Sequence, residues 1–135
     1  MTINEAVREA ASALAAVSDT PRLDAELLMA AALETDRGTM LLGRMRDDVP
    51  PGFAALLHRR LDHEPLAYIT GRQEFWTLSL AVSSSVLIPR SDSETLIEAA
   101  IDAFADQAPL RILDLGTGSG ALLLAALSHW RQAQG

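Results

Sequence analysis

Three glycines at alternate positions, Gly116, Gly118 and Gly120, follow a short apolar run near the end of this 135-residue chain. The run, residues 110–115, has the length and composition of a strand that is buried on both faces of a parallel sheet. Residues 121–130 after the glycines are predicted to form a helix. A strand, a glycine turn and a helix in this order predict the opening of a doubly wound α/β fold.

The glycine turn is also the sharpest chemical signal in the chain. Glycine lets ligand atoms approach the backbone, and the start of the next helix offers free N–H groups to a polar ligand. Gly116, Gly118 and Ala121 fit the dinucleotide pattern G-x-G-x-x-G/A, so a nicotinamide or flavin site is one interpretation. Asp114 favours another, because Asp-x-Gly-x-Gly-x-Gly resembles the first motif of S-adenosylmethionine-dependent methyltransferases. A turn that binds nothing is the remaining alternative.

Up to about Gly71 the apolar residues recur at helical spacing, which predicts a small helical bundle. Helix starts are indicated by the capping-box pair Thr2 and Glu5, by Thr20-Pro21, by Asp36 and by Pro50-Pro51.

Between Gln73 and Pro89 the apolar residues alternate with polar ones instead. Residues 75–82 form one such run, and residues 86–88 form a second after three serines. This pattern predicts a β-hairpin whose turn lies at the serines. A further amphipathic helix is then indicated by Leu96, Ile97, Ala100, Ile101 and Phe104.

Composition narrows the classes of function. Eighteen acidic residues against eleven basic ones, all arginine, give a net charge of −7, so direct nucleic-acid binding is not expected. The chain has no cysteine, and its three histidines show no metal-ligand spacing, so no metal site is expected. The apolar runs are too short to span a bilayer, and the N-terminus does not resemble a signal peptide. We therefore expect a cytoplasmic protein without membrane contact.

Several separate blocks of the sequence resemble one family. The blocks are Arg59-Arg60, residues 64–71, Glu74-Phe75-Trp76, residues 86–90 and residues 114–120. In order and spacing they resemble the release factor glutamine methyltransferases, the HemK or PrmC family. The resemblance covers most of the chain, from residues 23–28 onward. It is specific because generic methyltransferases share only the glycine loop.

The resemblance implies an α+β chain in three parts. Residues 1–72 would be a helical substrate-recognition domain, residues 73–90 a β-hairpin linker, and residues 91–135 an incomplete S-adenosylmethionine-binding, Rossmann-like domain. The implied reaction transfers a methyl group from S-adenosylmethionine to the side-chain amide of a glutamine in a class I peptide-chain release factor.

The resemblance also implies two groups of site residues. The cofactor contacts map to Asp114, Gly116, Thr117, Gly118, Ser119 and Gly120, and the substrate pocket maps to Ile88, Pro89, Arg90 and Glu94. Ser91 stands where the family has a proline, which leaves this turn less rigid. A salt bridge between Arg90 and Glu94, four residues apart, is the structural alternative for that pair.

The family grips the glutamine amide with an Asn-Pro-Pro-Tyr motif, which does not occur in these 135 residues. We therefore expect the chain to be the N-terminal half of such an enzyme, with no catalytic residue and no activity of its own. A stand-alone helical module that binds a protein partner is the alternative.

Overall fold

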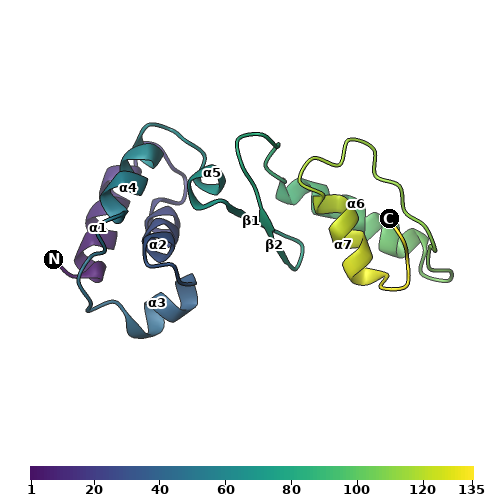
Figure 1. Ribbon diagram of the computed structural model, residues 1–135, viewed down its shortest axis with the longest axis horizontal. Helices are drawn as coiled ribbons and strands as arrows, with labels where there is room; N and C mark the ends of the chain where they lie inside the picture. The colour runs from purple at the N-terminus through teal and green to yellow at the C-terminus, as the bar shows by residue number, and fades with distance from the viewer. The chain divides into compact units, whose positions relative to one another are not determined.

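The computed structural model describes residues 1–135, which form two compact units, Met1–Thr70 and Gly71–Gly135. The expected α+β class is confirmed, since a helical first unit is followed by one two-stranded antiparallel sheet and further helices (Figure 1). The longest helices have 12 residues, and none of the helices combines the length and the apolar character needed to cross a bilayer.

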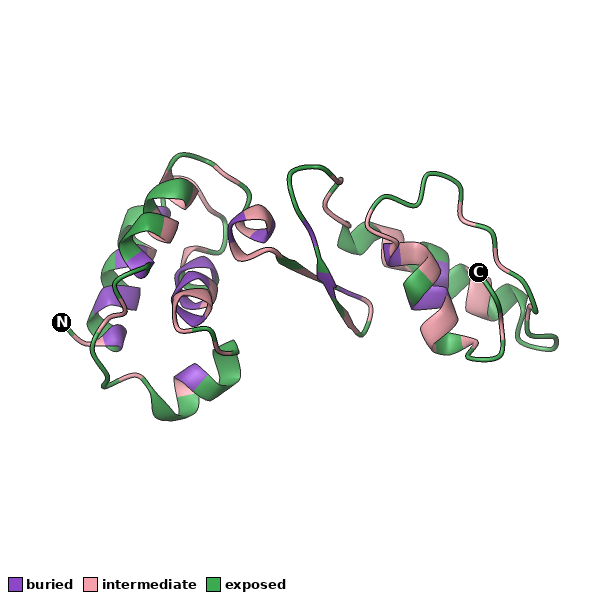
Figure 2. Ribbon diagram, in the orientation of Figure 1, coloured by how far each residue is buried: buried purple, intermediate pink, exposed green.

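The first unit is a bundle of short helices. They are α1 (Ile3–Leu14), α2 (Pro21–Ala32), α3 (Arg37–Gly43), α4 (Phe53–Leu61) and α5 (Leu66–Thr70). Their inward faces form one hydrophobic core, whose largest fully buried side chains are Ile3, Val7, Leu14, Leu28, Met29 and Met40. Figure 2 colours stretches of α1 and α2 as buried, and these two helices pack against each other; a shorter buried stretch lies in α3.

Local side-chain chemistry explains where two of these helices begin. The Thr2 hydroxyl accepts the Glu5 N–H at 3.3 Å, and the Glu5 carboxylate accepts the Thr2 N–H at 2.8 Å, which is the predicted capping box. The Asp36 carboxylate accepts the Thr39 N–H at 2.9 Å and so caps α3, again as predicted.

Helices α2 and α4 begin at or just after prolines, as predicted, whereas no sequence pattern predicted α5. Pro21 occupies the first position of α2, where its missing N–H removes no helical hydrogen bond. Helix α4 begins at Phe53, two residues after Pro50-Pro51. Helix α5 was not predicted, because five residues are too few to display a helical period.

The second unit contains a hairpin and two main helices. Its elements are β1 (Arg72–Phe75), β2 (Leu78–Ala81), the 3-10 turn η1 (Ser91–Ser93), α6 (Glu94–Ala103) and α7 (Ala121–His129). A small core joins the hairpin, α6 and α7 through Phe75, Leu80, Ile97, Ala121, Ala125 and Ala126. At its edge the Trp130 ring lies edge-on to Phe104 at 6.2 Å and to His129 at 5.1 Å between ring centroids.

The position of the hairpin turn differs from the prediction. Phe75 pairs with Leu78, so the turn falls on Trp76 and Thr77, inside the run predicted as the first strand. Residues 86–88, predicted as the second strand, are irregular. Trp76 has a φ of +56°, which a bulky residue rarely adopts. Neither glycine nor asparagine stands at this turn, so no local pattern predicts it.

The predicted strand at residues 110–115 is reduced to one isolated parallel bridge, between Arg111 and Gln134. The Ile112 N–H donates to the Gln134 carbonyl at 2.8 Å. Leu113 and Leu115 are 83% and 82% exposed. A strand of this kind extends and becomes buried only when neighbouring strands pair along it, and here a single residue pairs with it.

Candidate functional site

The three glycines of the turn all adopt left-handed backbone angles. The φ values of Gly116, Gly118 and Gly120 are +72°, +56° and +82°. Only glycine takes such angles without strain. A Cβ added at Gly116 or Gly118 would meet no atom within 4 Å, so backbone conformation, not crowding, requires glycine here. The same open space leaves the backbone accessible to a ligand.

Gly120 connects this turn to α7. Its N–H donates to the Thr117 carbonyl at 2.8 Å, and its own carbonyl accepts the Leu124 N–H at 2.8 Å. The first N–H groups of a helix have no acceptor within the helix, and its N-terminus carries a partial positive charge. Asp114 lies half-buried just before the turn. This arrangement of donors, an acid and open backbone fits a polar cofactor group.

Three of the four residues implied for the substrate pocket, Ile88, Pro89 and Arg90, lie on the irregular segment between β2 and α6. Ile88 and Pro89 are half-buried, and Arg90 is exposed. The Arg90 guanidinium pairs with the Asp92 carboxylate at 2.9 Å, with both side chains about three-quarters exposed. The alternative salt bridge from Arg90 to Glu94 does not form, because each of the two residues has another partner.

Glu94, the first residue of α6, contacts the hairpin. One of its carboxylate oxygens accepts the backbone N–H of Trp76 at 2.6 Å, across 18 residues of sequence. The role of Trp76 was missed, because a backbone donor leaves no trace in a sequence pattern. The structure thus joins Glu94 to the hairpin turn, and no hydrogen bond or ion pair joins either of them to the glycine turn.

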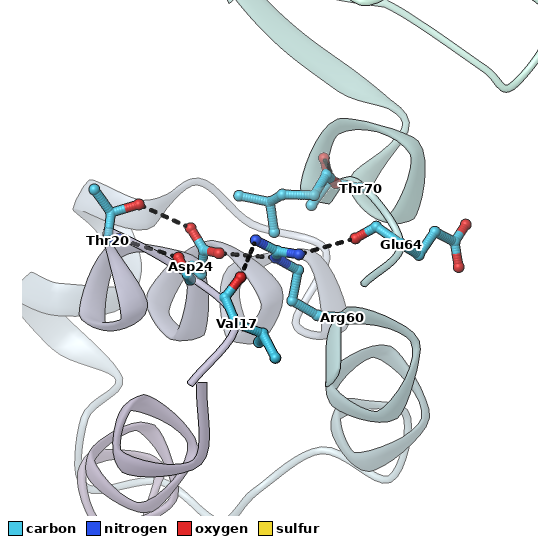
Figure 3. Close-up of polar contacts among 8 residues, drawn as sticks. Val17, Thr20, Asp24, Arg60, Glu64 and Thr70 are labelled. Atoms are coloured by element: carbon cyan, nitrogen blue, oxygen red, sulfur yellow. Dashed lines mark hydrogen bonds and ion pairs between the residues drawn. The ribbon is translucent and has the colours of Figure 1, made fainter. Parts of the chain in front are cut away.

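A second polar centre lies in the first unit, around Arg60 (Figure 3). The Arg60 Nε donates to Asp24 Oδ2 at 2.9 Å, and its two other nitrogens donate to the carbonyls of Glu64 and Val17, both at 3.3 Å. The Thr20 hydroxyl donates to the other oxygen of Asp24 at 3.1 Å. One guanidinium therefore links the chain after α1 with α2, α4 and the start of α5.

Glu26, on the same helix as Asp24, is buried between two arginines. Its carboxylate accepts hydrogen bonds from the Nε–H of Arg22 at 2.6 Å and from the Nε–H of Arg37 at 2.7 Å. Burial is the largest influence on this group and raises its pKa, but the two arginines together outweigh it and leave the pKa of Glu26 below its usual value. On the surface, the hydrogen bonds between Arg59 and Glu64 lower the pKa of Glu64.

These ion pairs give a structural role to residues that carried the family resemblance. Asp24, Glu26 and Arg60 hold the helical unit together by satisfying buried charges. These three residues were not predicted as a group, although the sequence holds one signal for them. Asp24 lies three and four residues before Leu27 and Leu28, so an acid stands on the apolar side of a helix.

Comparison with known proteins identifies the family. The PrmC N-terminal domain family matches residues 5–71. Proteins named release factor glutamine methyltransferase from Coxiella burnetii, Escherichia coli K12 and Moorella thermoacetica are 41%, 48% and 38% identical, over 96%, 91% and 96% of this chain. The alignments cover 49%, 45% and 47% of those proteins, so the chain spans about half the length of the curated relatives it matches. The chain therefore belongs to the PrmC family, and the relatives from Coxiella burnetii and Escherichia coli are both named release factor glutamine methyltransferase.

Proposed function

We propose that this chain serves the S-adenosylmethionine-dependent methylation of a glutamine side-chain amide in class I peptide-chain release factors, in the cytoplasm. The observation that carries the proposal is the 48% identity, over 91% of the chain, to an Escherichia coli protein named release factor glutamine methyltransferase. In this assignment residues 1–72 recognise the release factor, residues 73–90 form the hairpin linker, and residues 91–135 belong to the cofactor-binding part.

We assign the cofactor to the glycine turn, with Asp114, Gly116, Thr117, Gly118, Ser119 and Gly120 as its contacts. S-adenosylmethionine supplies a methyl group on a sulfonium centre. The left-handed glycines support the assignment because they leave the turn open, and the start of α7 supports it because it offers unpaired N–H donors to polar groups.

We assign the substrate side to Ile88, Pro89, Arg90 and Glu94. The half-buried Ile88 and Pro89 offer apolar contact, and Arg90 keeps donors in solvent because its single ion pair is exposed. A guanidinium in this state is able to exchange Asp92 for a carbonyl of a bound peptide at little cost, because exposed ion pairs contribute little free energy.

Methylation of an amide nitrogen needs more than the residues assigned above. An amide nitrogen is a poor nucleophile, because its lone pair is delocalised into the carbonyl. Its methylation depends on orienting the nitrogen toward the methyl group and on accepting its hydrogen bonds in the transition state. The Asn-Pro-Pro-Tyr motif that supplies this grip in the family is not among the 135 residues. We expect the 135-residue chain by itself to transfer no methyl group.

The test uses the full-length gene product, a purified class I release factor and methyl-labelled S-adenosylmethionine. Label is expected on one glutamine of the release factor, located by peptide mass spectrometry, and is expected to disappear when that glutamine is replaced by asparagine. The 135-residue chain assayed alongside is expected to give only background label. Absence of label with the full-length product would refute the proposed function.

A further inference from the structure

The hydrogen bond between Glu94 and Trp76 closes a loop of the second unit. The two residues are 18 positions apart, and the N–H to carboxylate distance is 2.6 Å. Between them lie β2, the irregular segment that carries Ile88, Pro89 and Arg90, and η1. A single side chain therefore ties together the two ends of the stretch to which the substrate pocket was assigned.

The acceptor of this hydrogen bond, the Glu94 carboxylate, is placed to form a strong and well-anchored contact. A hydrogen bond to an ionised carboxylate is shorter and stronger than one between neutral groups. Glu94 stands at the first position of α6, where the helix dipole favours a negative charge. Ile97, three residues on, is buried in the core of the second unit, so the helix that carries the carboxylate is anchored.

The donor end is held in an unusual conformation. Trp76 is a bulky residue at a φ of +56°, a conformation that persists only where the surroundings impose it. Its side chain packs partly buried against the core, beside Phe75, which is 1% exposed. The core thus fixes the Trp76 ring, and the Glu94 carboxylate holds the backbone N–H of the same residue.

We propose that Glu94 is a positioning residue: by accepting the Trp76 N–H it fixes the shape of the loop from the hairpin turn to α6, and with it the segment of Ile88, Pro89 and Arg90. Glu94 thus serves the substrate pocket, to which it was assigned with Ile88, Pro89 and Arg90, by holding this segment in place and not by touching the substrate itself. This inference rests on the proposed function in one respect, namely that the segment of Ile88, Pro89 and Arg90 contacts the release factor.

The first test follows the Trp76 amide directly, by NMR of the ¹⁵N-labelled 135-residue chain. In the unsubstituted chain this proton is expected to resonate downfield and to exchange slowly with solvent. Glu94→Ala is expected to speed its exchange about ten- to a hundredfold, the loss expected for one hydrogen bond to a charged group. Glu94→Gln keeps an acceptor oxygen without the charge, so an intermediate rate is expected.

The matched control is Glu98→Gln, which removes an exposed acid one turn further along α6 and is expected to leave the Trp76 amide unchanged. Unchanged exchange and chemical shift in both Glu94 variants would overturn the proposal. Should Glu94→Ala fail to fold, Glu94→Gln decides the question, because it preserves the size of the side chain.

The second test is kinetic and uses the full-length gene product with a release factor. Glu94→Gln is expected to raise KM for the release factor about tenfold, the equivalent of one weakened hydrogen bond, with kcat and the KM for S-adenosylmethionine little changed. Loss of kcat without a change at the Trp76 amide would mean direct action on the substrate and would overturn the proposal. If the unsubstituted enzyme methylates nothing, the proposed function fails, and the amide measurement alone decides the role of Glu94.

Discussion

At the scale of single residues, the first unit depends on charges that are removed from water and then fully paired. Asp24 and Glu26 are each 4% exposed. Asp24 is satisfied by Arg60 and Thr20, and Glu26 is satisfied by Arg22 and Arg37. No buried side-chain polar atom of the molecule lacks a hydrogen-bond partner. Removing one member of such a pair is therefore costly, because it leaves the other charge buried and alone.

Arg60→Ala is expected to destabilise the first unit by about 3 kcal/mol, because it leaves the Asp24 carboxylate uncompensated and frees two backbone carbonyls. Urea unfolding followed by far-ultraviolet circular dichroism measures the change. The neighbouring Arg59→Ala is the control, since Arg59 is exposed and its partner Glu64 is only half-buried, so the loss should be much smaller. Equal effects from the two substitutions would contradict the buried role of Arg60.

The lowered pKa of Glu26 predicts a pH dependence. A carboxyl whose pKa is lower in the folded state contributes stability above its unfolded value of 4.5, and this contribution is lost as pH falls through the lowered pKa. The free energy of unfolding, measured in urea at about pH 6 and about pH 3.5, should fall more in the unsubstituted chain than in Glu26→Gln. The same fall in both would show that Glu26 does not contribute to it.

At the scale of elements, the sequence predicted what is local and missed what depends on distant partners. The caps at Thr2 and Asp36 were predicted because donor and acceptor lie three residues apart. The hairpin turn at Trp76 was misplaced, because its left-handed backbone goes with contacts to Glu94 and to the core, which lie elsewhere in the chain. The strand at residues 110–115 was predicted from its apolar residues, but its formation depends on partners elsewhere in the chain.

In the candidate site, too, the local feature was predicted and the contacts between more distant residues were not. The glycine turn was predicted as a turn, and all three glycines do adopt angles that only glycine favours. The partners of Arg90 and Glu94 were not predicted. Their spacing of four residues suggests a salt bridge between the two, but Arg90 pairs with Asp92 and Glu94 accepts the N–H of Trp76. Whether these residues meet cofactor and substrate stays a prediction.

Gly120→Ala is expected to destabilise the turn and the start of α7 by about 1–2 kcal/mol, because alanine is strained at a φ of +82°. Space is not the cause, since the nearest atom to an added Cβ is Leu124 Cδ1 at 3.5 Å. Hydrogen exchange of the α7 amides measures the effect. Gly120→Asn should cost less, because asparagine tolerates left-handed angles, and equal losses would point to crowding instead.

At the scale of the whole molecule, the two units have separate cores of unequal quality. The first core draws on residues 3–69 and contains leucine, isoleucine, methionine and phenylalanine. The second contains six buried residues, of which three are alanines. Burial of apolar surface is the main source of stability, so the first unit is expected to be the more stable of the two.

Residues 1–70 expressed alone are expected to fold, because their core and buried ion pairs lie entirely within Met1–Thr70. Their amide NMR signals should overlay on those of the same residues in the 135-residue chain, and urea should unfold them in one cooperative transition. Residues 71–135 alone should show less protection from hydrogen exchange. A disordered 1–70 fragment would contradict the assignment of an independent core.

The placement of the aromatic residues has an optical consequence. Both tryptophans, Trp76 and Trp130, belong to the second unit, whereas the first unit contains one tyrosine, Tyr68, and no tryptophan. Emission excited selectively at tryptophan therefore reports on the second unit alone, while most of the helical ellipticity comes from α1 to α5. Tryptophan emission thus reports on the second unit, and far-ultraviolet ellipticity reports mainly on the first. Recorded on one sample, the two denaturation curves reveal without any label whether the units melt together or in sequence.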